Sequence, residues 1–483
     1  MSLPVSDHRS TELEGPKEQP KSPNLKSTVK SFLSHLTPLH HAFLLVVILS
    51  QVILVLYVTR NPKLSPSSES PAQPSPEFQA VAAAAAVDKC DSRWIYVYNL
   101  PPMFNYELKN NVCNQTNYCD RYSNDDFGPA AKELAGIVPE SILPAWYWTD
   151  VYSGDVLYHG RMLNYKCRTL EPESATAFYI PFYAGLAVEV EHHWRLEMFI
   201  KSVQEDKWWK RSNGSDHFIM LARTTWDFRR SREDDGWGSS FLSVPEILEH
   251  VVHLSVERNM WDDLEVAVPY PTVFHPRSES DIVEWQSFVR SRQRNHLFTF
   301  LGGPREFIEN GLRGALQKQC LDEPIACRQV DCYGNNCGID GTKAIMAAFL
   351  DSDFCLQEGD TVSKHAVVEC MLAGSIPVFF SPETAYWQYE LFMPVDPESY
   401  SVFIHHDDVS NGTDIKRVLG GYGREEVERM REKVIEYMPR FLYAKSSQGL
   451  EETRDAFDIA IEGVLSKYKA HMERGRIGNW NEI

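Results

Sequence analysis

One segment in the last third of the chain combines charged residues with the pattern of a ligand-binding turn. Residues 354–357 (FCLQ) read as a buried strand, a polar loop (EGDTVS) follows, and residues 364–373 (KHAVVECMLA) read as a helix. Ligands bind at the carboxyl ends of parallel strands, beside helix N-termini that attract phosphate. Lys364 and His365 add positive charge there, and Ser363 is a suitable N-cap. The segment predicts an anion site, although simple exposure of these helix residues fits the spacing equally well.

Two further groups could contact the same ligand. Glu369 lies on an otherwise apolar part of that helix, where a carboxylate needs a partner such as a sugar hydroxyl or a neighbouring Arg. Gly302 and Gly303 follow another expected strand and allow the backbone to approach a ligand closely. Arg305, two residues later, could reach a diphosphate. An ordinary tight turn also explains the two glycines.

Carboxylates elsewhere offer acid–base or metal chemistry. Asp227 follows the strand expected over 218–222 (FIMLA), where it could act as a general base. A structural Asp bonded to Arg229 or Arg230 is an equally good interpretation. The Asp-x-Asp pattern at 351–353 is typical of metal sites in sugar-nucleotide enzymes, but it precedes a strand, where such residues often cap a helix.

A scaffold of buried strands must position these residues. Several short runs are apolar throughout, as in parallel strands covered on both faces, and helical patterns such as Glu279–Arg292 and Lys343–Leu350 lie between them. The sequence therefore predicts an α/β fold. Prolines at 269–276 indicate a hinge between two lobes, and residues 451–473 predict a terminal amphipathic helix. The expected strands are 94–98, 177–182, 218–222, 297–301, 354–357 and 376–380.

The N-terminal region has a different character. Residues 42–58 (AFLLVVILSQVILVLYV) carry no charge and would span roughly 25 Å as a helix, the short end of a membrane span. Both flanks are polar or rich in Pro, Ser and Ala, so they offer no core for a buried helix to join. We expect 1–41 to be a cytoplasmic tail, 42–58 a transmembrane signal anchor and 59–88 a disordered stem.

Features after the span favour a luminal domain. Asn114, Asn213 and Asn411 each begin a glycosylation sequon there. All ten cysteines also follow the span, and most of them could pair in an oxidising compartment. We expect disulfides among Cys90, Cys113, Cys119 and Cys167 and among Cys320, Cys327, Cys332 and Cys337, whereas Cys355 and Cys370 read as buried thiols.

The composition excludes several classes of protein. The chain of 483 residues is 43% hydrophobic and 24% charged, as expected for a globular protein. A net charge of −19 argues against nucleic-acid binding, because phosphate backbones select basic surfaces. No G-x-S-x-G, H-E-x-x-H or Walker motif is present, so hydrolase and nucleotidase functions lack support.

An ordered set of segments resembles the exostosin-type glycosyltransferases of family 47, in particular their plant clade of xyloglucan galactosyltransferases. The resemblance runs from about Cys90 to about Leu450. Its segments are WIYVYNLP at 94–101, IPFYAGL at 180–186, DHF at 216–218, TWDFRR at 225–230, PYPT at 269–272, FHP at 274–276, FCLQ at 354–357 and LAGSIPVFF at 372–380.

The resemblance implies a GT-B fold, in which two Rossmann-like lobes flank a donor cleft, and an inverting, metal-independent transfer from a UDP-sugar. It implies an acceptor lobe over 89–275, with Tyr183 and His217 on the acceptor side and Asp227 as the base. It implies a nucleotide-sugar lobe over 276–483 that includes the terminal helix. The donor-binding residues implied are Gly302, Gly303, Arg305, Asp360, Ser363, Lys364, His365 and Glu369. No cofactor or metal is expected.

The chain departs from the family in the loop at 358–366, where Lys364 and His365 stand in place of an Arg pair. Lys keeps the charge but not the bidentate fork. The resemblance implies transfer of β-galactose from UDP-galactose to xyloglucan xylose in the Golgi, by a type II membrane protein that could join complexes with other glycosyltransferases. Galacturonosyl or arabinosyl transfer to xyloglucan, galactosyl transfer to mannan, and a non-catalytic subunit of a polysaccharide synthase remain open alternatives.

Overall fold

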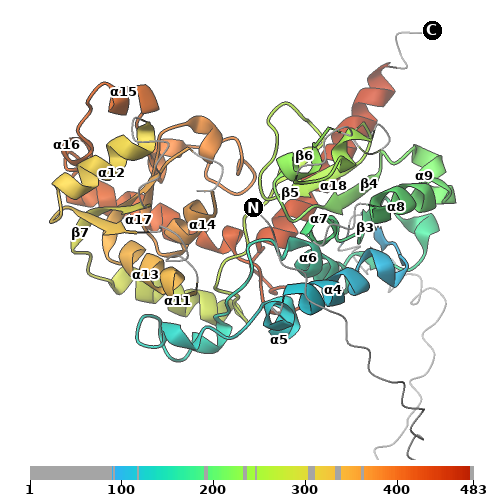
Figure 1. Cartoon of the computed structure of the whole chain (residues 1–483), viewed down its shortest axis with the longest axis horizontal. Helices are drawn as coiled ribbons and strands as arrows, with labels where there is room; N and C mark the ends of the chain where they lie inside the picture. Colours follow the sequence, from blue (N-terminus) through green and yellow to red (C-terminus); the bar gives the residue numbers. More distant parts are fainter. Residues whose placement is uncertain are drawn as a thin grey trace, which may run out of the picture. The chain divides into compact units, whose positions relative to one another are not determined.

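The computed structural model describes residues 90, 93–116, 119–189, 194–231, 237–244, 247, 249–302, 311–331, 339–359 and 364–478. The tail, anchor and stem expected over 1–41, 42–58 and 59–88 lie outside these residues. No helix within the described ranges is both long and apolar enough to cross a membrane. Residues 88–483 form one compact unit, and this unit contains two separate sheets (Figure 1).

The first sheet has six parallel strands in the order β2-β1-β3-β4-β5-β6. Every residue of β3, β4, β5 and β6 is buried, which agrees with the expectation of strands covered on both faces. The strands are β1 (Ile95–Val97), β2 (Arg168–Thr169), β3 (Ala177–Ile180), β4 (His217–Met220), β5 (Val252–Ser255) and β6 (Glu265–Ala267). The helices of this half are α4 (Tyr106–Thr116), α5 (Ser123–Asp126), α6 (Gly154–Leu163), α7 (Ala184–Glu189), α8 (Trp194–Gln204) and α9 (Lys207–Ser212).

The second sheet has five parallel strands in the order β11-β10-β9-β7-β8. Its strands are β7 (His296–Leu301), β8 (Cys327–Val330), β9 (Ser352–Gln357), β10 (Ile376–Phe379) and β11 (Val402–Phe403). Its helices are α11 (Glu279–Ser291), α12 (Leu312–Asp322), α13 (Ile339–Phe349), α14 (Lys364–Leu372), α15 (His406–Ser410), α16 (Ile415–Leu419) and α17 (Arg424–Tyr437). Two parallel sheets flanked by helices make the fold α/β and GT-B-like.

The carboxyl ends of the two sheets are joined by side-chain contacts. Beyond the end of β5, the backbone N–H of Arg258 donates to Oε1 of Gln388 at 3.0 Å, and Nε2 of Gln388 donates to the Arg258 carbonyl at 3.0 Å. Gln388 follows β10 of the second sheet. Tyr270 follows β6, and its ring lies 5.8 Å from the ring of His365 at the start of α14. The ligand-binding edges of both sheets therefore meet.

The terminal helix α18 (Ala456–Gly478) packs against β6 of the first sheet, and Figure 1 shows it among the elements of that half. A buried ion pair fixes its start, since Nη1 of Arg161 in α6 lies 3.0 Å from Oδ2 of Asp455. The helix begins later than the expected residue 451 because Oδ1 of Asp455 accepts the Asp458 N–H at 3.1 Å and so caps it.

Three disulfides lie within the described residues. Cys90–Cys167 and Cys320–Cys327 confirm pairing within each of the two expected cysteine groups. The expectation of buried thiols at Cys355 and Cys370 was wrong, because these residues form a disulfide between β9 and α14. Their separation along the chain hid the pairing, which arises only when the helix folds back onto its own strand.

Candidate active site

The carboxyl end of β4 presents the predicted base. Ala222, two residues beyond the strand, has a φ of +59°, a left-handed conformation that strains a residue with a side chain. The next residue, Arg223, donates from Nε to Oδ2 of Asp227 at 2.8 Å. The sequence offered Arg229 as an alternative partner of Asp227. That pairing was wrong, because Arg229 binds Asp262 and Glu265 instead.

Arg223 belongs to a row of alternating charges. Its Nη1 lies 3.9 Å from Oε2 of Glu189 at the end of α7. Arg121 contacts the other oxygen of Glu189, and its Nη2 lies 2.9 Å from Oδ1 of Asp150. These side chains are partly buried, so their mutual attraction is stronger than it would be in water. The row holds the side chains around Asp227 in fixed positions.

Aromatic rings connect this row to the second half. The Arg223 guanidinium lies 4.1 Å from the centre of the Tyr152 ring, and that ring lies 6.4 Å from the ring of Tyr270. The Tyr270 hydroxyl donates to Oε1 of Glu257 at 3.2 Å, and its ring meets His365 edge-on. Residues from both lobes thus converge at the carboxyl edges of the sheets.

His365 and Glu369 lie one turn apart on α14, with His365 Nε2 3.5 Å from Glu369 Oε1. Burial lowers the pKa of His365 to about 4, so its ring is neutral at physiological pH. Burial also raises the pKa of Glu369 to about 8, against a smaller opposing effect of the Val273 backbone. A buried acid of this kind is typical of a group that hydrogen-bonds a ligand.

Gly302 directly follows β7, beside an ion pair that the sequence did not suggest. Arg313 of α12 packs against the glycine so closely that a Cβ there would collide with the guanidinium. Arg313 also forms an ion pair with Glu358 at the end of β9. Of the other predicted donor-binding positions, Lys364 begins α14 but its side chain is not described, and Gly303, Arg305, Asp360 and Ser363 lie outside the described residues.

The two predicted acceptor-side residues occupy different edges of the first sheet. Tyr183 follows β3 at the carboxyl edge, and its hydroxyl lies 2.9 Å from Nδ1 of His159. His159 and Tyr106 line a pocket of ≈ 270 Å³ there. His217 begins β4 at the opposite edge and is fully buried, with Nδ1 2.7 Å from Asp216 Oδ1 and Nε2 2.8 Å from the Tyr98 hydroxyl. These contacts match a structural role for His217, whereas Tyr183 follows β3 at the carboxyl edge, the edge at which Asp227 follows β4.

The Asp-x-Asp pattern serves local structure. Oδ2 of Asp351 lies 2.9 Å from both Nη1 of Arg328 and Nδ1 of His296, and Asp353 contacts Arg431. Both carboxylates flank the first residue of β9, at the edge opposite the donor-side residues. Both carboxylates therefore have structural partners, although through ion pairs between segments rather than as a helix cap.

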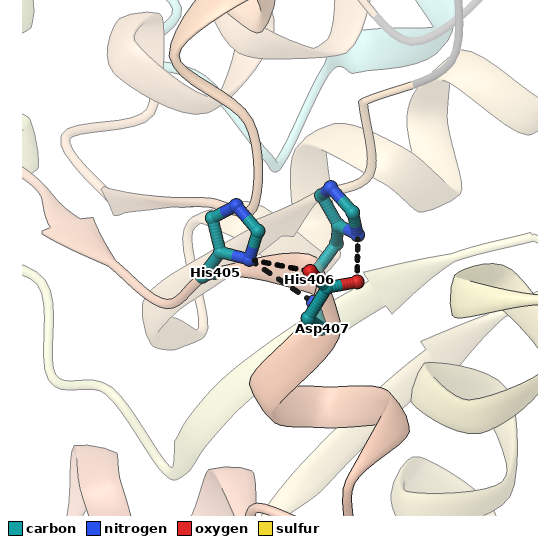
Figure 2. Close-up of side chains that lie close together, drawn as sticks. All are labelled: His405, His406 and Asp407. Atoms are coloured by element: carbon teal, nitrogen blue, oxygen red, sulfur yellow. Dashed lines mark hydrogen bonds and ion pairs between the residues drawn. The ribbon is translucent and has the colours of Figure 1, made fainter.

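A second group with metal-ligand chemistry follows β11. The imidazoles of His405 and His406 and the carboxylate of Asp407 have donor atoms within 4.8 Å of one another (Figure 2). All three side chains are exposed, and Nδ1 of His405 accepts the Asp407 N–H at 3.3 Å as the N-cap of α15. Their closeness follows from consecutive positions at this cap.

The arrangement suits transfer of a group between two bound molecules. One edge supplies a carboxylate oriented by an Arg, and the facing edge supplies a helix, α14, that carries the buried acid Glu369 in its second turn. Sequence patterns missed Arg121, Asp150, Glu189 and Arg313, because they come from segments far apart along the chain. Arg223 was detectable, since it directly follows the apolar run at 218–222.

A GT-B-like pair of parallel sheets with this site defines a glycosyltransferase. Residues 89–419 match the exostosin GT47 domain, and the chain belongs to that family. It is 48% identical over 398 residues to the xyloglucan galactosyltransferase XLT2 of Arabidopsis thaliana, covering 79% of this chain and 76% of that protein.

Other relatives in Arabidopsis thaliana show the range of the family. The probable xyloglucan galactosyltransferase GT12 is 37% identical, covering 80% of each chain. The xyloglucan-specific galacturonosyltransferase 1 is 34% identical, covering 78% of this chain and 57% of that protein. The match to the family supplies a sugar donor and a polysaccharide acceptor as its general substrates.

Proposed function

We propose that this glycosyltransferase moves β-galactose from UDP-galactose onto the xylosyl side chains of xyloglucan, with inversion at the anomeric carbon. The observation that carries the proposal is the 48% identity to the xyloglucan galactosyltransferase XLT2 over most of both chains. The geometry at the two carboxyl edges is compatible with it, because the predicted base and the donor helix belong to facing edges.

In the proposed reaction Asp227 accepts the proton of a xylose hydroxyl. The hydroxyl oxygen forms a bond to the anomeric carbon of galactose while the bond from that carbon to the UDP oxygen breaks, so UDP leaves with the bonding electrons. Arg223 orients the base through Oδ2 of Asp227.

We assign the donor to the second lobe. The N-terminus of α14, with Lys364 as its first residue, attracts the diphosphate, and the sequence adds Arg305, Gly303, Asp360 and Ser363 as donor-binding candidates. Buried Glu369 binds a ribose or sugar hydroxyl. No metal or cofactor has a role in this proposal. The ion pairs of Asp351 and Asp353 support a structural role for the Asp-x-Asp pattern.

Galacturonosyl transfer is the second candidate, because a relative carries that name. A uronic acid donor needs an additional cation near its carboxylate. His365 does not supply one, since burial lowers its pKa to about 4 and leaves the ring neutral. Lys364 is then the residue at the start of α14 left to supply that cation, and the choice between the two donor sugars falls to the donor panel below.

We further propose that the chain works in the Golgi lumen, anchored through residues 42–58 as a single-pass type II protein. The disulfides support an oxidising compartment. Asn213 and Asn411 are exposed and accessible to glycosylation, while the side chain of Asn114 is not described. Complexes with other Golgi glycosyltransferases belong to the same proposal.

A panel of donors tests the function. The purified chain is incubated with UDP-galactose, UDP-galacturonic acid, UDP-arabinose or UDP-xylose, each with xyloglucan or mannan oligosaccharides, and UDP release is measured. The proposal expects acceptor-dependent release with UDP-galactose and xyloglucan oligosaccharide. Release only with another pair would reassign the substrates, and no release with any pair would favour a non-catalytic subunit.

A further inference from the structure

Four exposed tryptophans follow strands of the two sheets. Among the described residues, Trp226, Trp237, Trp261 and Trp387 are 53%, 58%, 87% and 45% exposed, while Trp146, Trp209 and Trp285 are buried. Large exposed aromatic groups are costly in water and mark interaction sites when they gather. A single exposed tryptophan needs no explanation. The positions of the four tryptophans in the fold therefore decide whether they mark an interaction site.

All four tryptophans lie in segments that leave the carboxyl ends of strands, and the segment with Trp261 returns from β5 to the start of β6. Trp226 and Trp237 follow β4, and Trp261 lies between β5 and β6. β4 and β5 are neighbours in the first sheet, so their loops emerge side by side. Trp387 follows β10, at the facing edge of the second sheet. The same edges carry the predicted base and the donor helix.

Contacts place two of these tryptophans beside the predicted base. Trp226 directly precedes Asp227, and the Trp237 ring centre lies 5.3 Å from the guanidinium of Arg223. Ser239, two residues after Trp237, donates its N–H to the Asp227 carbonyl at 2.7 Å. The backbone around Asp227 therefore fixes the loop that presents Trp237.

Trp387 contacts Arg258 at the junction between the sheets, and Trp261 lies three residues after Arg258. Nη2 of Arg258 donates to the Trp387 carbonyl at 2.7 Å. The Trp261 N–H donates to Oδ1 of Asn259 at 3.0 Å, which fixes the turn that presents the exposed indole. Both indoles are thus displayed by backbone that is hydrogen-bonded, although the rings themselves face solvent.

We propose that Trp226, Trp237, Trp261 and Trp387 form a stacking platform for the glucan backbone of the polysaccharide acceptor. The negative face of an indole attracts the weakly positive C–H groups on the flat face of a β-linked sugar ring. Several indoles in succession would hold an extended neutral chain while one side-chain sugar reaches Asp227. The inference rests on the proposed function and adds acceptor subsites to it.

A neutral polymer fits this platform better than an acidic one. The row of charges behind it contains three carboxylates, of Asp150, Glu189 and Asp227, against the two guanidinium groups of Arg121 and Arg223. The whole chain carries a net charge of −19. Electrostatic repulsion would therefore oppose a polyanionic acceptor, whereas a neutral glucan meets no such penalty.

Binding of polysaccharide without donor tests the platform. The full chain is immobilised in detergent, and biolayer interferometry measures its affinity for xyloglucan, galactomannan and a short xylosylated oligosaccharide. We expect Trp261→Ala and Trp387→Ala each to weaken xyloglucan binding roughly five- to tenfold. Trp261→Phe should restore most of the affinity. Ile325→Ala, at an 88% exposed position before β8, is the control and should bind as the wild type does.

The outcomes separate the platform from the proposed function. Weaker binding of Trp261→Ala with rescue by Phe supports the platform even when no galactose transfer is found, and that combination would refute only the function. Unchanged polysaccharide binding in both Ala variants overturns the platform. This holds even if one of the variants has lost the binding of another protein. Binding of galactomannan rather than xyloglucan would also overturn the assignment to a glucan chain.

Discussion

Nε of Arg223 donates a hydrogen bond of 2.8 Å to Oδ2 of Asp227, four residues further along the chain. The Arg is itself held between the Tyr152 ring and Glu189, so the carboxylate has a defined orientation. A second Arg–Asp pair has the same spacing of four residues along the chain. In this pair Nε of Arg277 also lies 2.8 Å from Oδ2 of Asp281. Only the first pair lies at the carboxyl edge of a sheet.

This relationship predicts the effect of Asp227→Asn. The amide keeps the shape of the side chain but does not accept the acceptor proton, so kcat should fall roughly 10²- to 10⁴-fold. UDP-galactose affinity, measured by calorimetry, should stay the same because the donor binds the other lobe. Asp281→Asn removes the matched carboxylate and should leave kcat unchanged. Near-normal turnover in Asp227→Asn would remove this residue from the mechanism.

The raised pKa of Glu369, about 8, predicts a pH-dependent stability. Because the unfolded group titrates near pH 4.3, only the folded protein holds this proton between the two values. The unfolding free energy should therefore fall as pH rises through that window, by about 1.4 kcal/mol per pH unit from this residue. Glu369→Gln mimics the protonated form and should lose that part of the slope.

Thermal unfolding of both proteins from pH 5 to pH 8 measures the difference. The melting temperatures should differ least at pH 5 and most at pH 8, with Glu369→Gln the more stable. Glu428→Gln, at an exposed position on α17, is the control and should follow the wild type throughout. Parallel curves for wild type and Glu369→Gln would show that Glu369 is already ionised in the unliganded protein.

Arg161 attaches the terminal helix to the first sheet. Its guanidinium lies within 3.0 Å of Asp455, 3.6 Å of Asp458 and 4.7 Å of the Phe457 ring centre. Arg161→Ala leaves two carboxylates unpaired in a buried place and should cost about 3 kcal/mol of stability. Differential scanning fluorimetry should show a clearly lower melting temperature. Arg424→Ala breaks an exposed ion pair with Glu428 and should change the melting temperature little. Equal shifts of the melting temperature in the two variants would contradict the role given to Arg161.

The Cys355–Cys370 disulfide predicts that neither cysteine can be alkylated without a reductant. Both residues are completely buried, so the native chain should not react with iodoacetamide at either position. After unfolding without reductant they should remain unreactive, and non-reducing peptide mapping should recover the two peptides linked. Alkylation of Cys355 in unfolded, unreduced protein would restore the original expectation of buried thiols.

The sequence predicted those parts of the fold whose patterns are purely apolar. The runs at β1, β3, β4, β7, β9 and β10 were recognisable because buried parallel strands are continuously hydrophobic. β6 was missed since it begins with Glu265, a buried carboxylate that Arg229 neutralises from another loop. β8 carries two polar residues among four, and β2 and β11 contain only two residues each.

Site residues were predictable from the sequence only where they lie next to a recognisable strand in the same segment. Asp227, Glu369 and His365 stand beside recognisable strands, so their positions followed from the pattern. The partner of Asp227 did not, because Arg229 is closer in sequence than Arg223 but pairs with Asp262 and Glu265 in the folded chain. The charges of Arg121 and Glu189 join the site through tertiary folding, which no spacing in the sequence reveals.

The stereochemistry of the product tests the central claim most directly. The purified chain is incubated with UDP-galactose and a xylosylated glucan oligosaccharide, and the product is analysed by NMR spectroscopy. The account predicts a new β-anomeric galactose signal with a linkage to xylose, formed from the α-linked donor by inversion. An α-linked galactose, galactose on the glucan backbone, or no galactose in the product would contradict it.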